Sequence, residues 1–124
     1  MSLLFSKSHE WVNMIDDTTA QVGLTDYAQA ELGGLVFVNL PEEGDDVVSG
    51  EPFADVESVK AVSDVFSPVT GKVAEINEEL LDAPEKINET PYDAWFVKVE
   101  GITDKVELID EAAYKAYVST LSEE

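Results

Sequence analysis

The stretch EPFADVESVKAVSDVFS, residues 51–67, predicts two short strands joined by a tight turn. Valine and phenylalanine recur on each side of the turn, as is typical of strands in small β domains. Lys60 lies at the centre of the turn, in a chain that has seven lysines and no arginine. The sequence therefore predicts a β-hairpin with a lysine near its tip.

A weak internal repeat surrounds this hairpin. Val48-Ser49-Gly50 is similar to Val69-Thr70-Gly71, and each triplet leads into a predicted strand. Lys60 lies midway between the two glycines, so both arms of the hairpin have similar lengths. We expect Gly50 and Gly71, and also Gly33, to be turn or cap residues whose backbone conformation favours glycine.

Further short strands are expected along the rest of the chain, over residues 8–15, 18–24, 35–40, 72–76 and 95–100. In the second of these, Ala20 and Val22 are expected to share one face. Near residue 75, strict alternation would put Val73 and Glu75 on one face and Ala74 and Ile76 on the other. Residues 80–94 show no clear period and contain two prolines, Pro84 and Pro91, so we expect a loop that could include a helical turn.

Two helices are expected. The first lies near residues 26–32, with Thr25 as its N-cap and Gly33-Gly34 at its end. The second lies near residues 110–121, where an apolar stripe recurs at helical spacing and should pack on the β body: Tyr114, Tyr117, Val118 and Leu121. Many short strands and few helices indicate a mainly β protein, either a sandwich or a small barrel.

The composition excludes several classes of function. At 124 residues, one domain with its own core is expected. A formal charge of −20 disfavours nucleic acid and anionic membranes and suits partners with basic surfaces. The chain has no cysteine and one histidine, and the paired acidic residues lack the spacing of a calcium loop. These features favour a binding or carrier protein without a metal site over an enzyme. The start of the chain has no secretory pattern, so we expect a bacterial cytoplasmic protein, or a mitochondrial one if a transit peptide was removed.

Three roles are open for Lys60 on these grounds alone. It could be an ordinary exposed turn lysine, a basic contact for an acidic partner, or an attachment site for a covalent group. The third role requires an amine that a modifying enzyme can distinguish from six other lysines. A tight hairpin would isolate the amine, and the neighbours Ser58, Val59, Ala61 and Val62 are small.

Several motifs, in the same order along the chain, resemble the glycine cleavage system H-protein family. They are SHEW, VGLTDYAQAELGGLVFVNLPEEGD, ESVKAVSDVFSPVTGKV, INETPY and a strand led by tryptophan. The resemblance covers the chain from about Lys7 to Tyr117. It also separates this chain from biotin domains, where methionines flank the lysine, and from the lipoyl domains of 2-oxoacid dehydrogenases, which usually read D-K-A.

The resemblance implies a barrel-sandwich hybrid of two antiparallel sheets, 1–124 forming a single lipoyl-carrier domain. Lys60 would carry lipoic acid in amide linkage. The implied partners are glycine decarboxylase, a pyridoxal-phosphate enzyme, and aminomethyltransferase, which uses tetrahydrofolate. Dihydrolipoyl dehydrogenase would reoxidise the lipoyl arm, and a lipoate ligase or a lipoyl/octanoyl transferase would attach it. The protein itself would be a non-catalytic carrier, monomeric when free.

The resemblance also implies roles for residues around the lysine. Glu57 would be read by the modifying enzyme, together with the tip residues Ser58, Val59 and Ala61. Ser8, Glu10 and Asp64 would lie near a cleft where the loaded arm folds back. His9 and Trp11 match the family motif and are expected to be structural.

Two features depart from the family pattern. The family usually has Gly-x-Gly before the late tryptophan, where this chain reads PYDAW around Asp93, and the lack of arginine is unusual. Two alternative functions stay open: a relay that donates lipoyl groups to 2-oxoacid dehydrogenases, and an acidic binding module that carries no cofactor.

Overall fold

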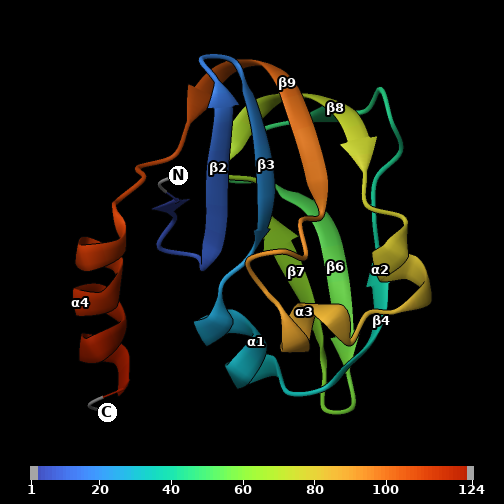
Figure 1. The fold of residues 1–124 in the computed structure, drawn as a ribbon, viewed down its shortest axis with the longest axis vertical. Coiled ribbons are helices and arrows are strands. Elements are labelled where there is room, and N and C mark those ends of the chain that lie inside the picture. The colour runs from blue at the N-terminus through green and yellow to red at the C-terminus, as the bar shows by residue number, and fades with distance from the viewer. Residues whose placement is uncertain (1–2, 123–124) are drawn as a thin grey trace.

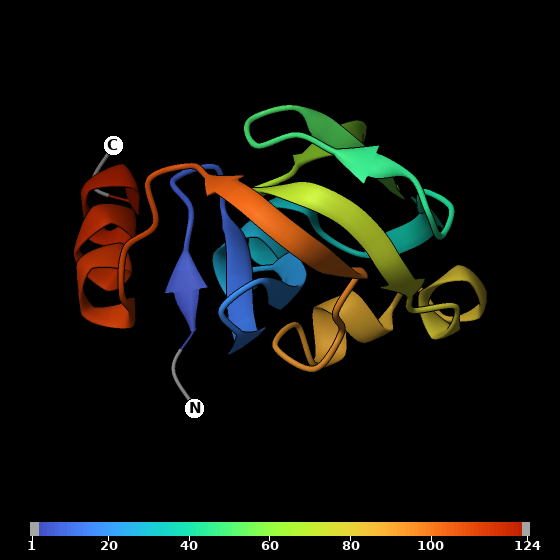
Figure 2. The same cartoon turned by 90° about the horizontal axis from the view of Figure 1, so that it is seen from above.

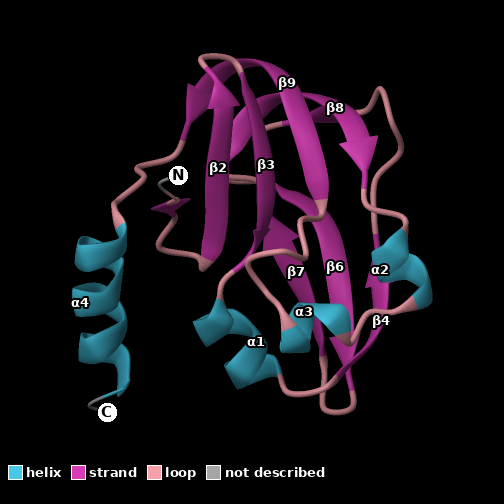
Figure 3. Ribbon diagram, in the orientation of Figure 1, coloured by secondary structure: helices cyan, strands magenta, loops and turns pink. Residues whose placement is uncertain are grey.

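The structure is a computed structural model and describes residues 3–122. It contains two antiparallel sheets, which Figures 1 and 3 show as ribbons. The larger sheet comprises, in spatial order, β1 (Leu4–Phe5), β2 (Glu10–Asp16), β3 (Thr19–Leu24), β9 (Val97–Lys105), β8 (Val69–Ile76) and β5 (Asp46–Val47). The smaller sheet comprises β4 (Leu35–Asn39), β6 (Pro52–Ser58) and β7 (Val62–Phe66). The predicted mainly β fold of two antiparallel sheets is confirmed.

Four helices accompany the sheets: α1 (Asp26–Leu32), α2 (Glu79–Asp82), α3 (Lys86–Glu89) and α4 (Glu111–Ser122). α1 has the predicted bounds, and the backbone N–H of Ala28 donates to the Thr25 hydroxyl at 3.2 Å, as expected for an N-cap. Gly33 ends α1 with a φ of 83°, a left-handed conformation that favours glycine. Within the described residues, none of these helices is long and apolar enough to cross a membrane.

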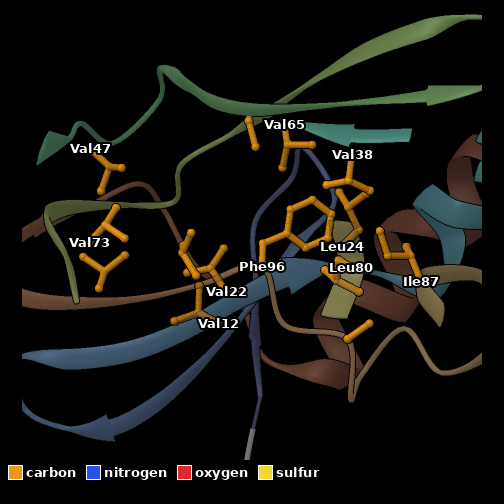
Figure 4. Packing of buried hydrophobic residues seen from close by; sticks show 14 of the residues in the cluster. Val12, Val22, Leu24, Val38, Val47, Val65, Val73, Leu80, Ile87 and Phe96 are labelled. Atoms are coloured by element: carbon orange, nitrogen blue, oxygen red, sulfur yellow. The ribbon is translucent and has the colours of Figure 1, made fainter. Parts of the chain in front are cut away.

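The hydrophobic core lies between the two sheets (Figure 4). Val22 and Val73 come from the larger sheet, Val38 and Val65 from the smaller, and Phe96, which precedes β9, is fully buried among them. Each such side chain contributes roughly 1.5–3 kcal/mol to folding when it is fully buried. The core therefore fixes how the two sheets face each other, and with them the hairpin formed by β6 and β7.

The segment from residue 80 to 94 differs from the predicted loop, because it contains most of α2 and all of α3. Each helix has four residues, too few for a helical period to be visible in the sequence. Leu80 and Ile87 are nevertheless fully buried and close one end of the core. One apolar anchor per turn, rather than a repeating stripe, stabilises these two helices.

Two predictions about β8 were wrong. Val73 pairs with Val99 and Glu75 with Lys98, so the strand has a bulge at this point, and Ile76 packs against the same core as Val73. A bulge shifts the alternation of side chains by one residue, which a strict period of two cannot anticipate. Gly71 is likewise not a turn residue, because it lies within β8, where a Cβ would come within 2.6 Å of the Glu100 carbonyl oxygen.

The predicted internal repeat has a structural counterpart. The backbone N–H of Ser49 donates to the Thr70 hydroxyl at 2.8 Å, and the two hydroxyl groups lie 3.1 Å apart. The matching positions of the two triplets thus contact each other directly. This contact lies where the chain enters β6 and β8, so it ties the base of the hairpin to the larger sheet.

α4 packs beside β1 at one edge of the larger sheet, as Figure 2 shows from above. Tyr114 is buried and stacks on Phe5, with ring centroids 4.7 Å apart and an angle of 9° between the ring planes. Tyr117 and Val118 pack against the same small cluster, which also contains Trp11. The predicted apolar stripe of the C-terminal helix therefore faces the β body.

Candidate functional site

Lys60 lies in the turn between β6 and β7. Figure 1 shows this turn at the lower end of the molecule. The backbone N–H of Ser58 donates to the carbonyl of Ala61 at 2.8 Å and closes the turn. The Ser58 hydroxyl is buried and accepts hydrogen bonds from the backbone N–H groups of Lys60 and Ala61, both at 3.1 Å. One serine side chain therefore fixes the backbone of the tip on which Lys60 stands.

The tip itself is open to solvent. Lys60 and Ala61 are exposed, and Val59 and Val62 expose 78% and 65% of their surface. Isolated exposed valines are common on protein surfaces, but here two of them flank one lysine. The arrangement leaves the lysine accessible to a second protein.

The tip of the hairpin contacts the C-terminal end of α1. The Lys60 amine donates to the backbone carbonyl of Glu31 at 3.3 Å, and the backbone N–H of Val59 reaches the carbonyl of Gly34 at 3.4 Å. A side chain at position 33 would begin 3.2 Å from Cε of Lys60, which is a tight contact. Gly33 therefore serves two purposes, the left-handed end of α1 and clearance for the lysine.

Lys60 also differs from the other lysines in its charge partners. Within residues 3–122, five of the seven lysines lie within 4.0 Å of a carboxylate: Lys7, Lys72, Lys86, Lys98 and Lys115. Lys60 and Lys105 have no such partner in this range. Acylation of Lys60 would consequently break no ion pair.

A pocket of about 170 Å³ opens beside the tip, between α1, the start of β2 and β7. It brings together the three residues that the family resemblance placed near a cleft, Ser8, Glu10 and Asp64. Glu31, whose carbonyl accepts from the Lys60 amine, lines the same pocket. Its remaining lining is mixed and largely apolar: His9, Leu24, Tyr27, Ala28, Leu32, Val56, Ser63 and Val65.

Glu10 is the most unusual side chain of the pocket, because it is only 1% exposed. The hydroxyl groups of Ser6 and Ser8 donate to its Oε1 at 2.7 and 2.5 Å. Burial raises the pKa of Glu10 to about 7, against the weaker opposing effect of these hydrogen bonds and of one from the backbone of Phe66. No basic side chain of the described residues pairs with Glu10, so its ionised form would be stabilised by a cation that enters the pocket.

Glu57 lies elsewhere. It is exposed on the outer face of the smaller sheet, in register between Phe37 and Val62 on the neighbouring strands. Phe37 and Val62 are also exposed, so the carboxylate stands between two apolar side chains close to the tip. This face is separate from the pocket and is accessible to a protein that approaches Lys60.

His9 and Trp11 have different surroundings. Trp11 is buried, and its indole N–H donates to the carbonyl of Pro91 at 3.0 Å, which agrees with a structural role. His9 lines the pocket and has a φ of 76°, and its Nδ1 lies 2.8 Å from the hydroxyl of Tyr114.

Two residues of the site were not found by sequence reasoning, Ser6 and Tyr114. Ser6 donates to Glu10 across an irregular turn, and no periodic pattern links positions 6 and 10. Tyr114 is distant in sequence and was assigned only to the apolar stripe of the C-terminal helix. Its hydroxyl group, which ordinarily needs a partner when buried, was the one available signal.

Comparisons with known proteins agree on one family. Residues 3–123 match the family described as Glycine cleavage H-protein. The glycine cleavage system H protein of Lachnoclostridium phytofermentans is 67% identical over 117 residues, 94% of this chain and 92% of that protein. The one from Vibrio campbellii is 52% identical over 124 residues, 99% and 98% of the two chains. The crystal structure of a glycine cleavage system H protein from Mycobacterium marinum superposes with a TM-score of 0.88 at 35% identity, and covers 95% of this chain and 97% of that one.

Proposed function

Because this chain belongs to the glycine cleavage H-protein family, we propose that Lys60 is the residue that carries its lipoyl group. The protein is a non-catalytic lipoyl carrier of glycine cleavage, and its partners are glycine decarboxylase and aminomethyltransferase. The observation that carries the assignment is the hairpin tip. There the buried Ser58 hydroxyl fixes the turn, and the exposed Lys60 has no ion pair among residues 3–122.

The residues around Lys60 fit such a group. The lipoyl group would supply a dithiolane, the sulfur chemistry that a chain without cysteine lacks. The open tip leaves room for a modifying enzyme, and the adjacent pocket offers apolar walls for a hydrocarbon arm. Conversion of the amine to an amide removes one positive charge, so the formal charge changes from −20 to −21.

The pocket beside the tip supports a resting place for the loaded arm. An aminomethyl group carries a basic amine, and Glu10 is a buried carboxylate without a cationic partner among residues 3–122. An amine that enters the pocket would favour the ionised form of Glu10, with Ser8 and Asp64 as further oxygen ligands. Leu24 and Val56 would limit the access of water to the amine.

The outer face of the tip would serve recognition. We assign Glu57, with Val59 and Ala61, to contacts with the lipoate ligase or the lipoyl/octanoyl transferase that modifies Lys60. Dihydrolipoyl dehydrogenase would be the third enzyme that the arm visits. An acidic carrier should associate with basic docking surfaces quickly and in a salt-sensitive manner. The bacterial relatives support a bacterial cytoplasmic location.

Glycine–bicarbonate exchange catalysed by glycine decarboxylase tests this function. Lipoylated wild-type protein should support the exchange, and a Lys60→Arg variant treated with the same ligase should leave it near the rate without carrier. Lys105→Arg is the matched control, because Lys105 is also exposed and also lacks an ion-pair partner among the described residues. Lipoylated protein that does not support exchange would instead favour the relay function.

A further inference from the structure

His9 has a backbone conformation that side-chain-bearing residues rarely adopt. Its φ of 76° is the one positive value among the non-glycine residues that the structure describes. Histidine reaches this region more readily than most residues, but the conformation is still less favourable than an extended or helical one. Such a residue persists only where its surroundings hold it in place, and it often marks a functional site.

The conformation of His9 determines the course of the chain along the arm pocket, as we call the pocket beside Lys60 that Ser8, Glu10 and Asp64 line. His9 lies between Ser8 and Glu10, and the chain turns sharply around it through hydrogen bonds from His9 N to Ser6 O at 3.1 Å and from Ser6 N to Glu10 O at 2.9 Å. This turn brings the hydroxyl of Ser8 within 2.5 Å of the Glu10 carboxylate. An extended residue at position 9 would leave Ser8 and Glu10 on one face of a strand but about 6.5–7 Å apart, and it would carry Ser6 still farther from the carboxylate that both hydroxyl groups reach in this turn.

The imidazole of His9 forms a hydrogen bond with a residue of the C-terminal helix. Its Nδ1 lies 2.8 Å from the hydroxyl of Tyr114 on α4, and that hydroxyl lies 2.8 Å from the hydroxyl of Thr25. The rings of Tyr27 and Tyr117 also lie near the imidazole, with centroids 4.6 and 6.1 Å from that of His9. α4 thus reaches the pocket through the polar contact between Tyr114 and His9, which lies among aromatic rings.

The direction of the hydrogen bonds follows from the donors available. Thr25 is fully buried, and among the described residues the Tyr114 oxygen is the one acceptor that its hydroxyl proton reaches, so that proton goes to the Tyr114 oxygen. Tyr114 then donates to Nδ1 of His9, which leaves the imidazole proton on Nε2. Burial also lowers the pKa of His9, which favours the neutral ring that this arrangement requires.

We propose that Tyr114 is a positioning residue for the arm pocket: by holding the His9 imidazole it keeps residue 9 in the left-handed conformation that places Ser8 beside Glu10. The inference rests on the proposed arm pocket. Through this contact the C-terminal helix would help to hold the loaded arm, although α4 contributes no residue to the pocket lining itself.

The first test uses the protein without any bound cargo. Because His9 is the single histidine of the chain, its ring nitrogens give one set of NMR signals. In the wild type we expect the Nε2–H tautomer, and in Tyr114→Phe a mixture of both tautomers. The backbone N–H of Thr25, which donates to the His9 carbonyl at 3.1 Å, should exchange with solvent about fivefold faster in the variant, the factor that corresponds to one net hydrogen bond. Tyr117→Phe is the matched control, since it changes the same residue type beside the same imidazole.

The second test uses the aminomethyl-loaded, lipoylated protein. Tyr114→Phe should release the aminomethyl group to water about fivefold faster than the wild type, and Tyr117→Phe should not. In a His9→Gly background, glycine adopts the left-handed conformation unaided, so adding Tyr114→Phe should have no further effect. If Tyr114→Phe folds poorly, position 9 alone tests the same point: His9→Ala should speed release, because alanine resists the left-handed conformation, and His9→Gly should release more slowly than His9→Ala.

The outcomes separate the two proposals. Equal release rates in Tyr114→Phe and wild type, or an unchanged His9 tautomer, would overturn the positioning role. If instead the wild type releases its cargo as fast as free aminomethyl-dihydrolipoamide, the arm pocket itself is refuted. An equal effect of Tyr114→Phe with and without His9 would also contradict the inference, because Tyr114 would then act by another route.

Discussion

The buried Glu10 should make the stability of the protein depend on pH in a way that one substitution can isolate. Its pKa is about 7 in the folded protein, against 4.5 for the ordinary group. The folded state therefore binds a proton more tightly than the unfolded state, and stability falls as the pH rises from about 4.5 to about 7. Above this window, the ionised carboxylate costs about 3 kcal/mol of the free energy of unfolding, since each pKa unit corresponds to 1.36 kcal/mol.

Glu10→Gln removes the charge and keeps an oxygen that can accept from Ser6 and Ser8. We expect the variant to be more stable than the wild type by about 3 kcal/mol at pH 8.5, and by less than about 1 kcal/mol at pH 5, where the native Glu10 is already protonated. Urea denaturation at both pH values measures the difference. The comparison with wild type cancels the general repulsion among the other acidic residues.

Glu57→Gln is the control, because Glu57 is exposed and should change the free energy of unfolding by less than about 0.5 kcal/mol at either pH. The reasoning about Glu10 would be refuted if Glu10→Gln shifted stability equally at pH 5 and pH 8.5, or destabilised the protein at the higher pH. Either result would mean that the carboxylate is well solvated or paired with a cation in the unloaded protein.

Three further predictions concern the framework of the site. Gly71→Ala should destabilise the protein by about 1–3 kcal/mol in urea denaturation, because the new Cβ would lie 2.6 Å from a backbone oxygen. Gly34→Ala, whose Cβ would have nothing within 4 Å, should change stability little, and equal effects of the two variants would contradict the packing argument. Ser58→Ala should lower the free energy of unfolding by about 1–3 kcal/mol and slow the lipoylation of Lys60, because two N–H groups of the turn lose their acceptor. An unchanged modification rate would show that the turn does not depend on the hydroxyl. Thr25→Ala should lower the free energy of unfolding by about 1–2 kcal/mol in urea or thermal denaturation, because α1 loses its N-cap. Thr25→Ser should keep most of the wild-type stability, and a serine variant as unstable as Thr25→Ala would count against capping.

The hairpin, α1 and the apolar stripe of α4 could be predicted from the sequence because each depends on local signals. Thr25 and the glycine pair bound α1 through capping rules, and the stripe through Tyr114 recurs over a helix long enough to show a period. α2 and α3 are four residues each, so their two buried anchors, Leu80 and Ile87, form no pattern.

The bulge in β8 and the close approach at Gly71 depend on the partner strand, β9, which lies far away in the sequence. The same limit applies to the site. Lys60 could be singled out from its own turn, and the family motifs indicated Ser8 and Glu10. The contact from Tyr114 to His9 joins residues 105 positions apart, and no local rule encodes it.

The most direct test of the account is the site of acylation itself. Intact mass and peptide mapping after incubation with a lipoate ligase should show one lipoyl group on the wild type and on Lys105→Arg, attached at Lys60, and none on Lys60→Arg. Among the lysines of residues 3–122, only Lys60 and Lys105 lack a carboxylate partner, and only Lys60 stands on a turn fixed by a buried serine. A lipoyl group on Lys60→Arg, or an unmodified wild type, would contradict the central claim.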